Sequence, residues 1–134
     1  MLNITLTLAL IFACSNVFAQ KISSFDAQKF YFAINEDKKP QIVDVRNKAE
    51  FDAEHIKGAI NIDINQIDFQ KKIIKKLKKD RIVYLYCTKG IRSLQAAQIL
   101  SNLDFIRIYN LDRGLEAWKK QGYPVKTNNN KGKF

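Results

Sequence analysis

The chain has 134 residues, which is enough for one domain and too few for two domains of ordinary size. Hydrophobic residues make up 46% of it, so it has the material for a real core. Its 23 Lys and Arg residues against 13 Asp and Glu give a net charge of +10, which suits an acidic partner, an anionic membrane surface or small anionic substrates. The simpler explanation of this charge is a genome with a biased base composition, which enriches Lys, Asn and Ile. We favour this explanation and also expect the charge to attract anions modestly.

The first 19 residues differ from the rest because they contain no Lys, Arg, Asp or Glu. The apolar stretch Ile4–Ala13 is followed by Val17-Phe18-Ala19, which suits signal peptidase. We predict a signal peptide at 1–19, cleaved before Gln20, and hence an exported protein that is periplasmic or secreted. The alternatives are a buried N-terminal helix, an uncleaved anchor, or a lipid anchor attached to Cys14.

Residues 20–126 are treated as one domain in which predicted helices and strands alternate. Ser23 and Asp26 resemble a capping box that starts a helix running to Ile34. Further helices are expected at 47–51, 65–79, 93–103 and 114–121, and strands at 41–45, 59–62, 82–86 and 105–111. Strand 82–86 is the most hydrophobic and is expected at the centre of the sheet. The side chains expected to be buried on helix 93–103 are Leu94, Ala97, Ile99 and Leu100.

Strands that alternate with helices indicate an α/β fold with a central parallel sheet and helices on both faces. Ligands bind beyond the carboxyl ends of the strands in such sheets. Cys87 directly follows strand 82–86, so it is expected at such an end. Residues 127–134 form a polar tail that we expect to be disordered.

The predicted helix at 65–79 carries a dense set of lysines: Lys71, Lys72, Lys75, Lys76, Lys78 and Lys79. Adhesion to anionic lipid or nucleic acid is one interpretation, and a solvated lysine face is the other. We favour the solvated face, because no aromatic residues interleave with the lysines. We therefore expect no nucleic-acid partner and no membrane contact, and we keep an acidic protein partner as an alternative.

The segment from Tyr84 to Ser93 carries the candidate site. Cys87 ends an apolar run, and the short loop after it contains Gly90 and the cations Lys89 and Arg92. Backbone N–H groups at a helix start lack partners and favour anions, so they stabilise a thiolate. Once 1–19 is removed, Cys87 has no partner for an internal disulfide. We therefore predict a reactive thiol, with a buried inert cysteine as the alternative.

Four further motifs accompany this loop in order along the chain: Val43-Asp44-Val45-Arg46, Glu50-Phe51, His55-Ile56-Lys57-Gly58-Ala59, and Leu111 with Gly114 and Ala117-Trp118. Together with Cys87–Arg92 they resemble the single-domain rhodanese family of sulfurtransferases, over residues 24–125. One position departs from the family pattern, because Arg113 stands in place of the first Gly of the closing pair. A side chain there either constrains the loop or alters the rim of the pocket.

The resemblance implies a sulfurtransferase of the thiosulfate:cyanide or thiosulfate:thiol type. Cys87 would take sulfur from a small anionic donor as a persulfide and pass it to a thiol or cyanide. The loop residues would bind the substrate, with their amides around the outer sulfur: Thr88, Lys89, Gly90, Ile91 and Arg92. Lys89 would neutralise the sulfonate end of the donor, and Arg92 would either face the substrate or tie the loop to a carboxylate.

The remaining motif residues are implied to support the site. Asp44 would end its strand, Arg46 would brace the loop or add charge to the pocket, and His55 would be a hydrogen-bonded structural residue. No cofactor is expected, and no metal, because one histidine and one mature cysteine do not make a zinc site. The alternatives are a sulfur-carrier or protein-binding module that docks through the basic helix, and a phosphatase. A phosphatase is disfavoured because the loop is one residue shorter than in protein tyrosine phosphatases.

Overall fold

The computed structural model describes residues 21–128; the predicted signal at 1–19, Cys14 and residues 129–134 lie outside this part. Five parallel strands form the main sheet in the order β1-β6-β5-β2-β4. They are β1 (Ile22–Phe25), β2 (Gln41–Asp44), β4 (Ile60–Asn61), β5 (Val83–Tyr86) and β6 (Ile108–Leu111). All four residues of the central strand β5 are buried, as its hydrophobicity predicts.

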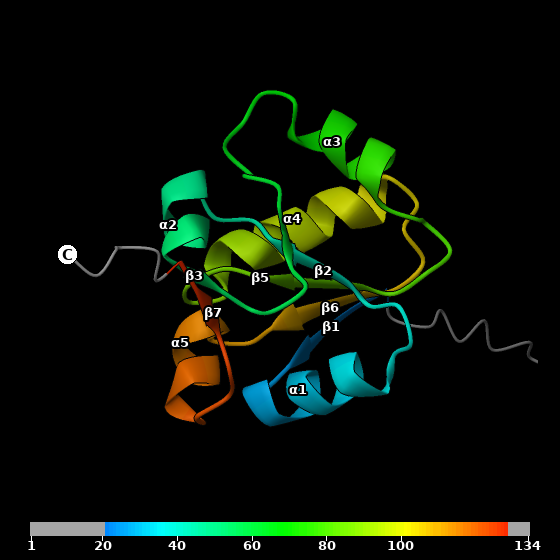
Figure 1. Cartoon of the computed structure of the whole chain (residues 1–134). Helices are drawn as coiled ribbons and strands as arrows, with labels where there is room; N and C mark the ends of the chain where they lie inside the picture. Colours follow the sequence, from blue (N-terminus) through cyan, green and yellow to red (C-terminus); the bar gives the residue numbers. More distant parts are fainter. Residues whose placement is uncertain (1–20, 129–134) are drawn as a thin grey trace, which may run out of the picture.

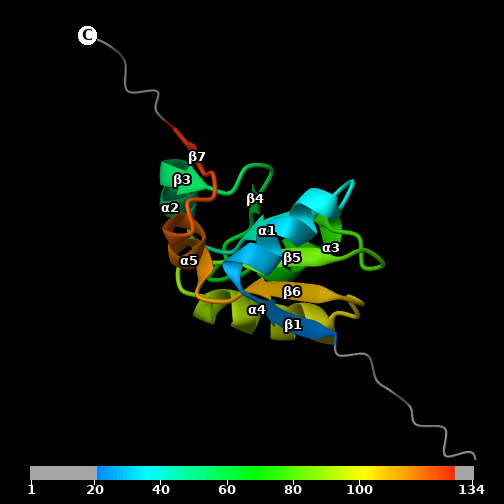
Figure 2. The same cartoon turned by 90° about the horizontal axis from the view of Figure 1, so that it is seen from below.

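Helices cover both faces of this sheet, which confirms the predicted α/β fold (Figure 1). One face is covered by α3 (Phe69–Lys76) and α4 (Ile91–Asn102), and the other by α1 (Ala27–Glu36) and α5 (Gly114–Lys120). Figure 2 shows β1 and β6 side by side at one edge of the sheet. Among residues 21–128, every helix is too short or too polar to span a lipid bilayer.

A small second sheet lies near the carboxyl ends of the main strands (Figure 1). It pairs β3 (Glu54–His55) with β7 (Lys126–Thr127) in antiparallel fashion, next to the short helix α2 (Lys48–Ala53). No strand is predicted from the sequence at either of its two segments. Thr127, the first residue of the predicted tail, belongs to it.

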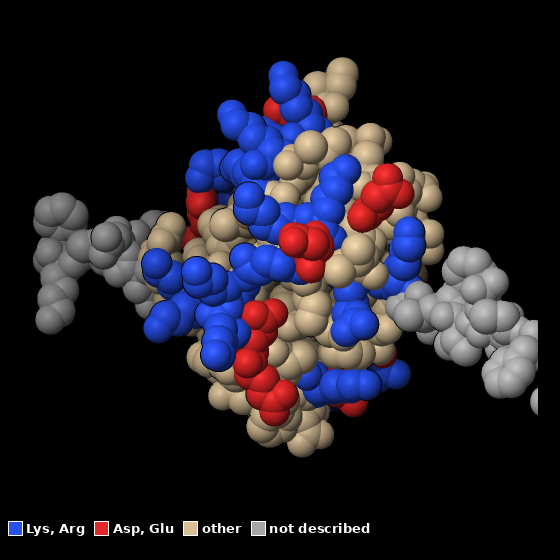
Figure 3. All heavy atoms as spheres, turned by 90° about the vertical axis from the view of Figure 1, so that its right-hand side faces the viewer, with Lys and Arg blue, Asp and Glu red and all other residues tan. Residues whose placement is uncertain are grey.

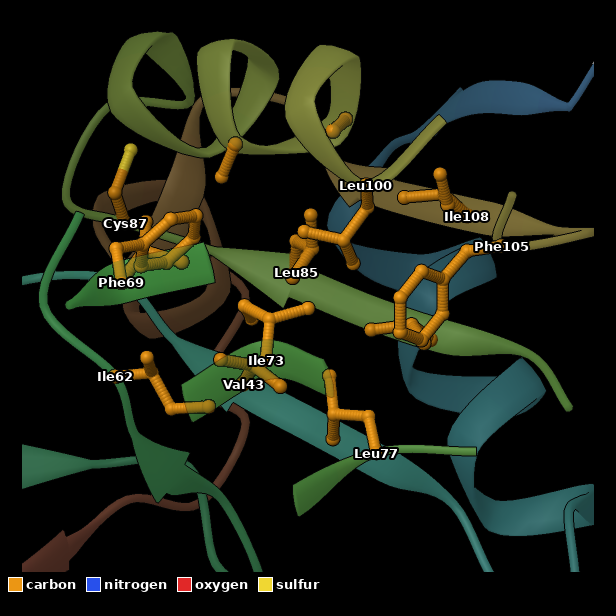
Figure 4. Close-up of a cluster of buried hydrophobic side chains, with 14 residues drawn as sticks. Val43, Ile62, Phe69, Ile73, Leu77, Leu85, Cys87, Leu100, Phe105 and Ile108 are labelled. Carbon is orange, nitrogen blue, oxygen red and sulfur yellow. The ribbon is translucent and has the colours of Figure 1, made fainter. Parts of the chain in front are cut away.

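The apolar core between the sheet and α3 and α4 reaches the candidate site. Val43, Leu85 and Leu100 are fully buried in this core, and Cys87, at the end of β5, is only 1% exposed. Figure 4 shows the Cys87 sulfur directed from the end of β5 toward α4. A close-packed core on one side therefore fixes the position of the thiol.

The segment predicted as the start of the first helix forms β1 instead. Ile22–Phe25 pairs in parallel with Ile108–Leu111. Asp26 rather than Ser23 caps α1, because its side chain accepts a hydrogen bond from Lys29 N at 2.8 Å. The predicted capping box is wrong because pairing with a distant strand outweighs the local helical pattern.

Burial on α4 also differs from the prediction. Leu94 is 43% exposed and Ile99 is half-buried, because the helix turns a different stripe toward the sheet: Ser93, Ala96, Ala97 and Leu100. Several other elements are shorter than predicted. Helix α3 starts at Phe69 and ends at Lys76, because the next residue, Leu77, has extended backbone, and β6 starts only at Ile108.

The buried phenol of Tyr86 gives a prediction about alkaline pH. Burial raises its pKa, and the nearby Asp44 carboxylate adds to this effect. In the unfolded chain the pKa is about 10, so above about pH 10 the unfolded state loses a proton that the folded state keeps. The free energy of unfolding should therefore fall as pH rises past 10, by up to about 1.4 kcal/mol per pH unit for this residue.

Urea unfolding at a series of pH values from about 9 to about 11 measures this slope. Tyr86→Phe should make the decline shallower, although it also removes the hydrogen bond that Ile56 N donates to the phenol at 3.0 Å and so lowers stability at every pH. Equal slopes in wild type and variant would contradict the prediction.

Candidate active site

Cys87 lies where main-chain and side-chain donors converge on its sulfur. Gly90 N donates to Sγ at 3.1 Å and Ser93 N at 3.4 Å. The Ser93 hydroxyl lies 3.3 Å from the same sulfur. Three groups thus surround Sγ and favour negative charge on it. Ser93 is not among the site residues predicted from the sequence, although a polar residue in the first turn of a helix that follows a cysteine is a signal for such a contact.

The start of α4 supplies most of this environment. Gly90 caps the helix with a φ of +90°, a left-handed conformation that glycine adopts without steric cost. Ile91 and Arg92 begin the helix, and within residues 21–128 neither of their backbone N–H groups has an acceptor. These amides and the helix dipole add positive potential beside the thiol.

Helix α5 holds the loop from the other side. Leu115 N donates to Cys87 O at 2.8 Å, and Glu116 N donates to Thr88 O at 3.1 Å. In a trans peptide the following N–H points opposite to the carbonyl. Because both carbonyls point toward the start of α5, the N–H groups of Thr88 and Lys89 point away from it. The start of α5 therefore orients the amides of the cysteine loop.

Gly114 permits this close contact. A Cβ atom at this position would lie 2.4 Å from Cys87 O and 2.5 Å from Thr88 O, which no real side chain tolerates. Its φ of +62° is also left-handed. The preceding Arg113 has a φ of +58° as well, a strained conformation for a residue with a side chain.

Arg113 is the residue that departs from the family pattern. It lines a hollow of about 540 Å³ between α1 and α5, whereas Cys87 opens onto a different hollow. Its backbone lies against the loop, since a Cβ on Gly90 would come within 3.0 Å of Arg113 N. Of the two effects expected of a side chain here, the contact with Gly90 fits a constraint on the loop, because Arg113 does not line the hollow of Cys87.

Arg92 is held by a carboxylate. Its Nη1 donates to Glu50 Oε1 at 3.2 Å and its Nη2 to Glu50 Oε2 at 3.1 Å, and Nη2 also donates to Thr88 Oγ1 at 3.2 Å. The hydrogen bond with Glu50 raises the pKa of Arg92. Arg92 was expected either to face the substrate or to tie the loop to a carboxylate, and its bonds to Glu50 and Thr88 fit the second role. Glu50 is a partner that the sequence analysis recorded only as part of a motif.

A buried ion pair lies behind the loop. Arg46 Nη2 donates to Asp44 Oδ2 at 2.7 Å and to Glu54 O at 2.7 Å. Asp44 is fully buried and Arg46 is only 4% exposed, so neither side chain extends into solvent. This pair joins the end of β2 to β3. Arg46 also lies beside the Glu50 carboxylate, with 3.9 Å from Nε to Oε2.

The hollow above Cys87 has a volume of about 360 Å³ and is lined by the residues of the loop: Cys87, Thr88, Lys89, Ile91 and Arg92. Lys89 is exposed there and forms no ion pair with the described residues. His55 lies elsewhere, with its ring stacked on Phe51 and its Nδ1 2.8 Å from Phe51 O. Within residues 21–128, no three His, Cys, Asp or Glu side chains are grouped to bind a metal ion.

Comparison with known proteins identifies the family. A family model described as "Rhodanese-like domain" matches residues 26–121. The chain belongs to the rhodanese-like domain family. The Bacillus subtilis "Uncharacterized protein YqhL" is 41% identical over 81 residues, which cover 60% of this chain and 62%, less than two thirds, of that relative.

Two further comparisons agree with this rhodanese assignment. The Vibrio cholerae "Thiosulfate sulfurtransferase GlpE" is 34% identical over 93 residues, 69% of this chain and 85% of that protein. The solution structure of the rhodanese-like domain of the Anabaena Alr3790 protein superposes with a TM-score of 0.71 at 25% identity, covering 87% of this chain and 88% of that one. The predicted family and fold are thereby confirmed, and the chain has relatives that are named sulfurtransferases.

Proposed function

We propose that this rhodanese transfers sulfane sulfur from thiosulfate, or a similar small anionic donor, to a thiol or cyanide through a persulfide on Cys87. The observation that carries the proposal is the set of polar groups around Sγ: Gly90 N and Ser93 N, which donate to it at 3.1 Å and 3.4 Å, and the Ser93 hydroxyl at 3.3 Å. These groups stabilise a thiolate without a general base. The hollow whose lining includes Cys87 is where a small donor would bind.

The reaction divides into two displacements. In the first, the Cys87 thiolate attacks the outer sulfur of thiosulfate, a new S–S bond forms, and the bond to the sulfonate sulfur breaks, so that sulfite leaves with the electron pair. In the second, a nucleophilic thiolate or cyanide attacks the outer sulfur of the persulfide and releases the Cys87 thiolate. The loop amides of Thr88 and Lys89, which point away from α5, would stabilise charge on the outer sulfur.

Initial-rate kinetics test this proposal. When thiosulfate is varied at several fixed concentrations of cyanide, double-reciprocal plots should give parallel lines, because sulfite leaves before cyanide binds. Intersecting lines would contradict a persulfide intermediate. Persulfide formation without turnover of any small acceptor would favour the sulfur-carrier alternative, and hydrolysis of an aryl phosphate would favour a phosphatase.

Lys89 gives a prediction about donor specificity. We propose that its exposed ammonium group attracts the sulfonate end of the donor, so Lys89→Gln should raise KM for thiosulfate by about fivefold while kcat changes little. The effect should shrink at high ionic strength, because salt screens exposed charges. Lys57→Gln, which removes an exposed charge outside the hollow, is the matched control. An equal effect of both substitutions would assign the change to overall charge instead.

We also propose that residues 1–19 are an export signal and that the protein acts outside the cytoplasm. The uncharged apolar segment and the Val17-Phe18-Ala19 sequence support this. Mass spectrometry of the N-terminus of protein made in bacterial cells should show a chain starting at Gln20. A chain starting at Met1, or at a lipid-modified Cys14, would contradict this processing.

A further inference from the structure

Cations from distant parts of the sequence meet at the edge of the main sheet opposite Cys87, where the amino ends of its parallel strands lie. The segments before β2, β5 and β6 meet there, since Ile106 N donates to Lys79 O at 3.0 Å and Val83 N donates to Arg107 O at 3.0 Å. The Arg81 guanidinium also donates to Lys39 O. These contacts bring together the segments that carry six loop cations: Lys38, Lys39, Lys78, Lys79, Arg81 and Arg107.

Helix α3 adds four more lysines: Lys71, Lys72, Lys75 and Lys76. We call these ten residues the basic face. Five acidic residues lie in the same segments: Glu36, Asp37, Asp68, Asp80 and Asp104. The rest of the described chain has eleven cationic residues against eight acidic ones, so the unbalanced charge is concentrated here. Figure 3, which looks onto the side where this edge lies, shows many of the Lys and Arg side chains gathered on it.

Isoleucine side chains are exposed beside these cations. Ile74 on α3 is 49% exposed, and Ile106, whose backbone bonds to Lys79, is 56% exposed. Lysines that alternate with exposed aliphatic groups suit the surface of an anionic bilayer, where ammonium groups meet phosphates and apolar groups enter the acyl boundary. A single-stranded nucleic acid would favour exposed aromatic rings instead of isoleucines.

The polypeptide enters the domain at this same edge. Lys21 O accepts a hydrogen bond from Ile108 N at 2.7 Å, so the first described residue lies at the amino end of β6. The described chain therefore begins beside the basic face.

We propose that the basic face docks on an anionic lipid bilayer. The strands are parallel, so the basic face lies at their amino ends and Cys87 at the carboxyl end of β5. A bilayer on the basic face leaves the hollow above Cys87 open to solvent. The sequence alone predicts a solvated lysine face because the pattern of lysines is visible only within the segment of α3, whereas the fold adds six loop cations and the exposed side chains of Ile74 and Ile106.

Co-sedimentation of the processed protein, which starts at Gln20 and lacks the apolar stretch Ile4–Ala13, with vesicles tests this proposal. Vesicles of equal parts phosphatidylglycerol and phosphatidylcholine should bind the protein at low salt, and phosphatidylcholine alone should bind it at least about tenfold more weakly. Lys71→Glu, Lys75→Glu and Lys78→Glu combined should weaken binding to the anionic vesicles by about a hundredfold. All three side chains are exposed, and thermal melting checks that the variant is folded.

The matched control reverses three exposed lysines elsewhere: Lys57→Glu, Lys120→Glu and Lys126→Glu. It has the same net charge, so equal loss of binding in both triple variants would overturn the proposal in favour of a nonspecific charge effect. Ile74→Ser should weaken vesicle binding several-fold without any change of charge. Binding of a DNA oligonucleotide in preference to the anionic vesicles at the same salt would assign the face to nucleic acid and would also overturn it. Vesicle-bound protein should still form the Cys87 persulfide.

Discussion

Cys87→Ser should lower thiosulfate turnover by about a thousandfold or more, with the fold retained. A serine hydroxyl in this position is not ionised at neutral pH, and oxygen cannot carry the sulfur as a persulfide. The serine fits the site, because the donors around Sγ (Gly90 N and Ser93 N) can bond to an oxygen equally well. We therefore expect the free energy of unfolding to change by less than about 1 kcal/mol. Steady-state turnover and urea unfolding measure the two effects.

Cys14→Ser, assayed in the uncleaved chain, is the matched control, because it removes the chain's other cysteine and leaves Cys87 in place. Its turnover should equal that of the wild type. Substantial turnover by Cys87→Ser would remove the cysteine from the mechanism, and loss of turnover by Cys14→Ser alone would move the chemistry outside the described residues.

Gly114→Ala should have the largest effect on stability. The new Cβ would meet the Cys87 and Thr88 carbonyl oxygens at 2.4 Å and 2.5 Å, so α5 must move away from the loop. The contact and the left-handed φ of +62° together should cost about 4 kcal/mol. For a domain of this size we expect the Tm to fall by about 15 °C or more. Differential scanning calorimetry measures this change.

The same substitution should also reduce turnover, because a displaced α5 no longer donates to Cys87 O and Thr88 O. Gly58→Ala is the control: its φ is +86°, and no heavy atom lies within 4 Å of the added Cβ. It should cost only the strain of its backbone, about 1 kcal/mol, and leave turnover unchanged. Equal destabilisation by both substitutions would show that the contact between α5 and the loop is unimportant.

Much of the fold could be predicted from local sequence. The apolar run 82–86 predicted the central strand, and β5 occupies Val83–Tyr86. The position of Cys87 followed from these elements, because a residue after a central parallel strand must lie at the carboxyl edge of the sheet. The alternation of helices and strands then gave the layered architecture.

The missed elements depend on partners far away in the chain. Strand β1 pairs Ile22 with Ile108, and β3 pairs His55 with Lys126. Segments of two to four residues have too little periodicity to be assigned without those partners. The local pattern at Ser23 favoured a helix, and only the presence of β6 reverses that preference.

The same reason explains what was missed at the site. Arg92 lies 42 positions from Glu50 along the chain, and their ion pair forms only because α2 and the cysteine loop meet at one end of the sheet. The bonds from α5 to the Cys87 and Thr88 carbonyls also join distant segments. The chain sequence shows which groups carry charge near the cysteine, whereas the fold decides which of them are neutralised.

The most direct test of the account is the intact mass of the protein after incubation with thiosulfate and removal of the excess. We predict that the mass rises by one sulfur atom, that the added sulfur maps to the peptide containing Cys87, and that cyanide returns the mass to its starting value. An unchanged mass under conditions in which an alkylating reagent still modifies Cys87 would contradict the account, because the thiol would then be accessible and yet unable to accept sulfur.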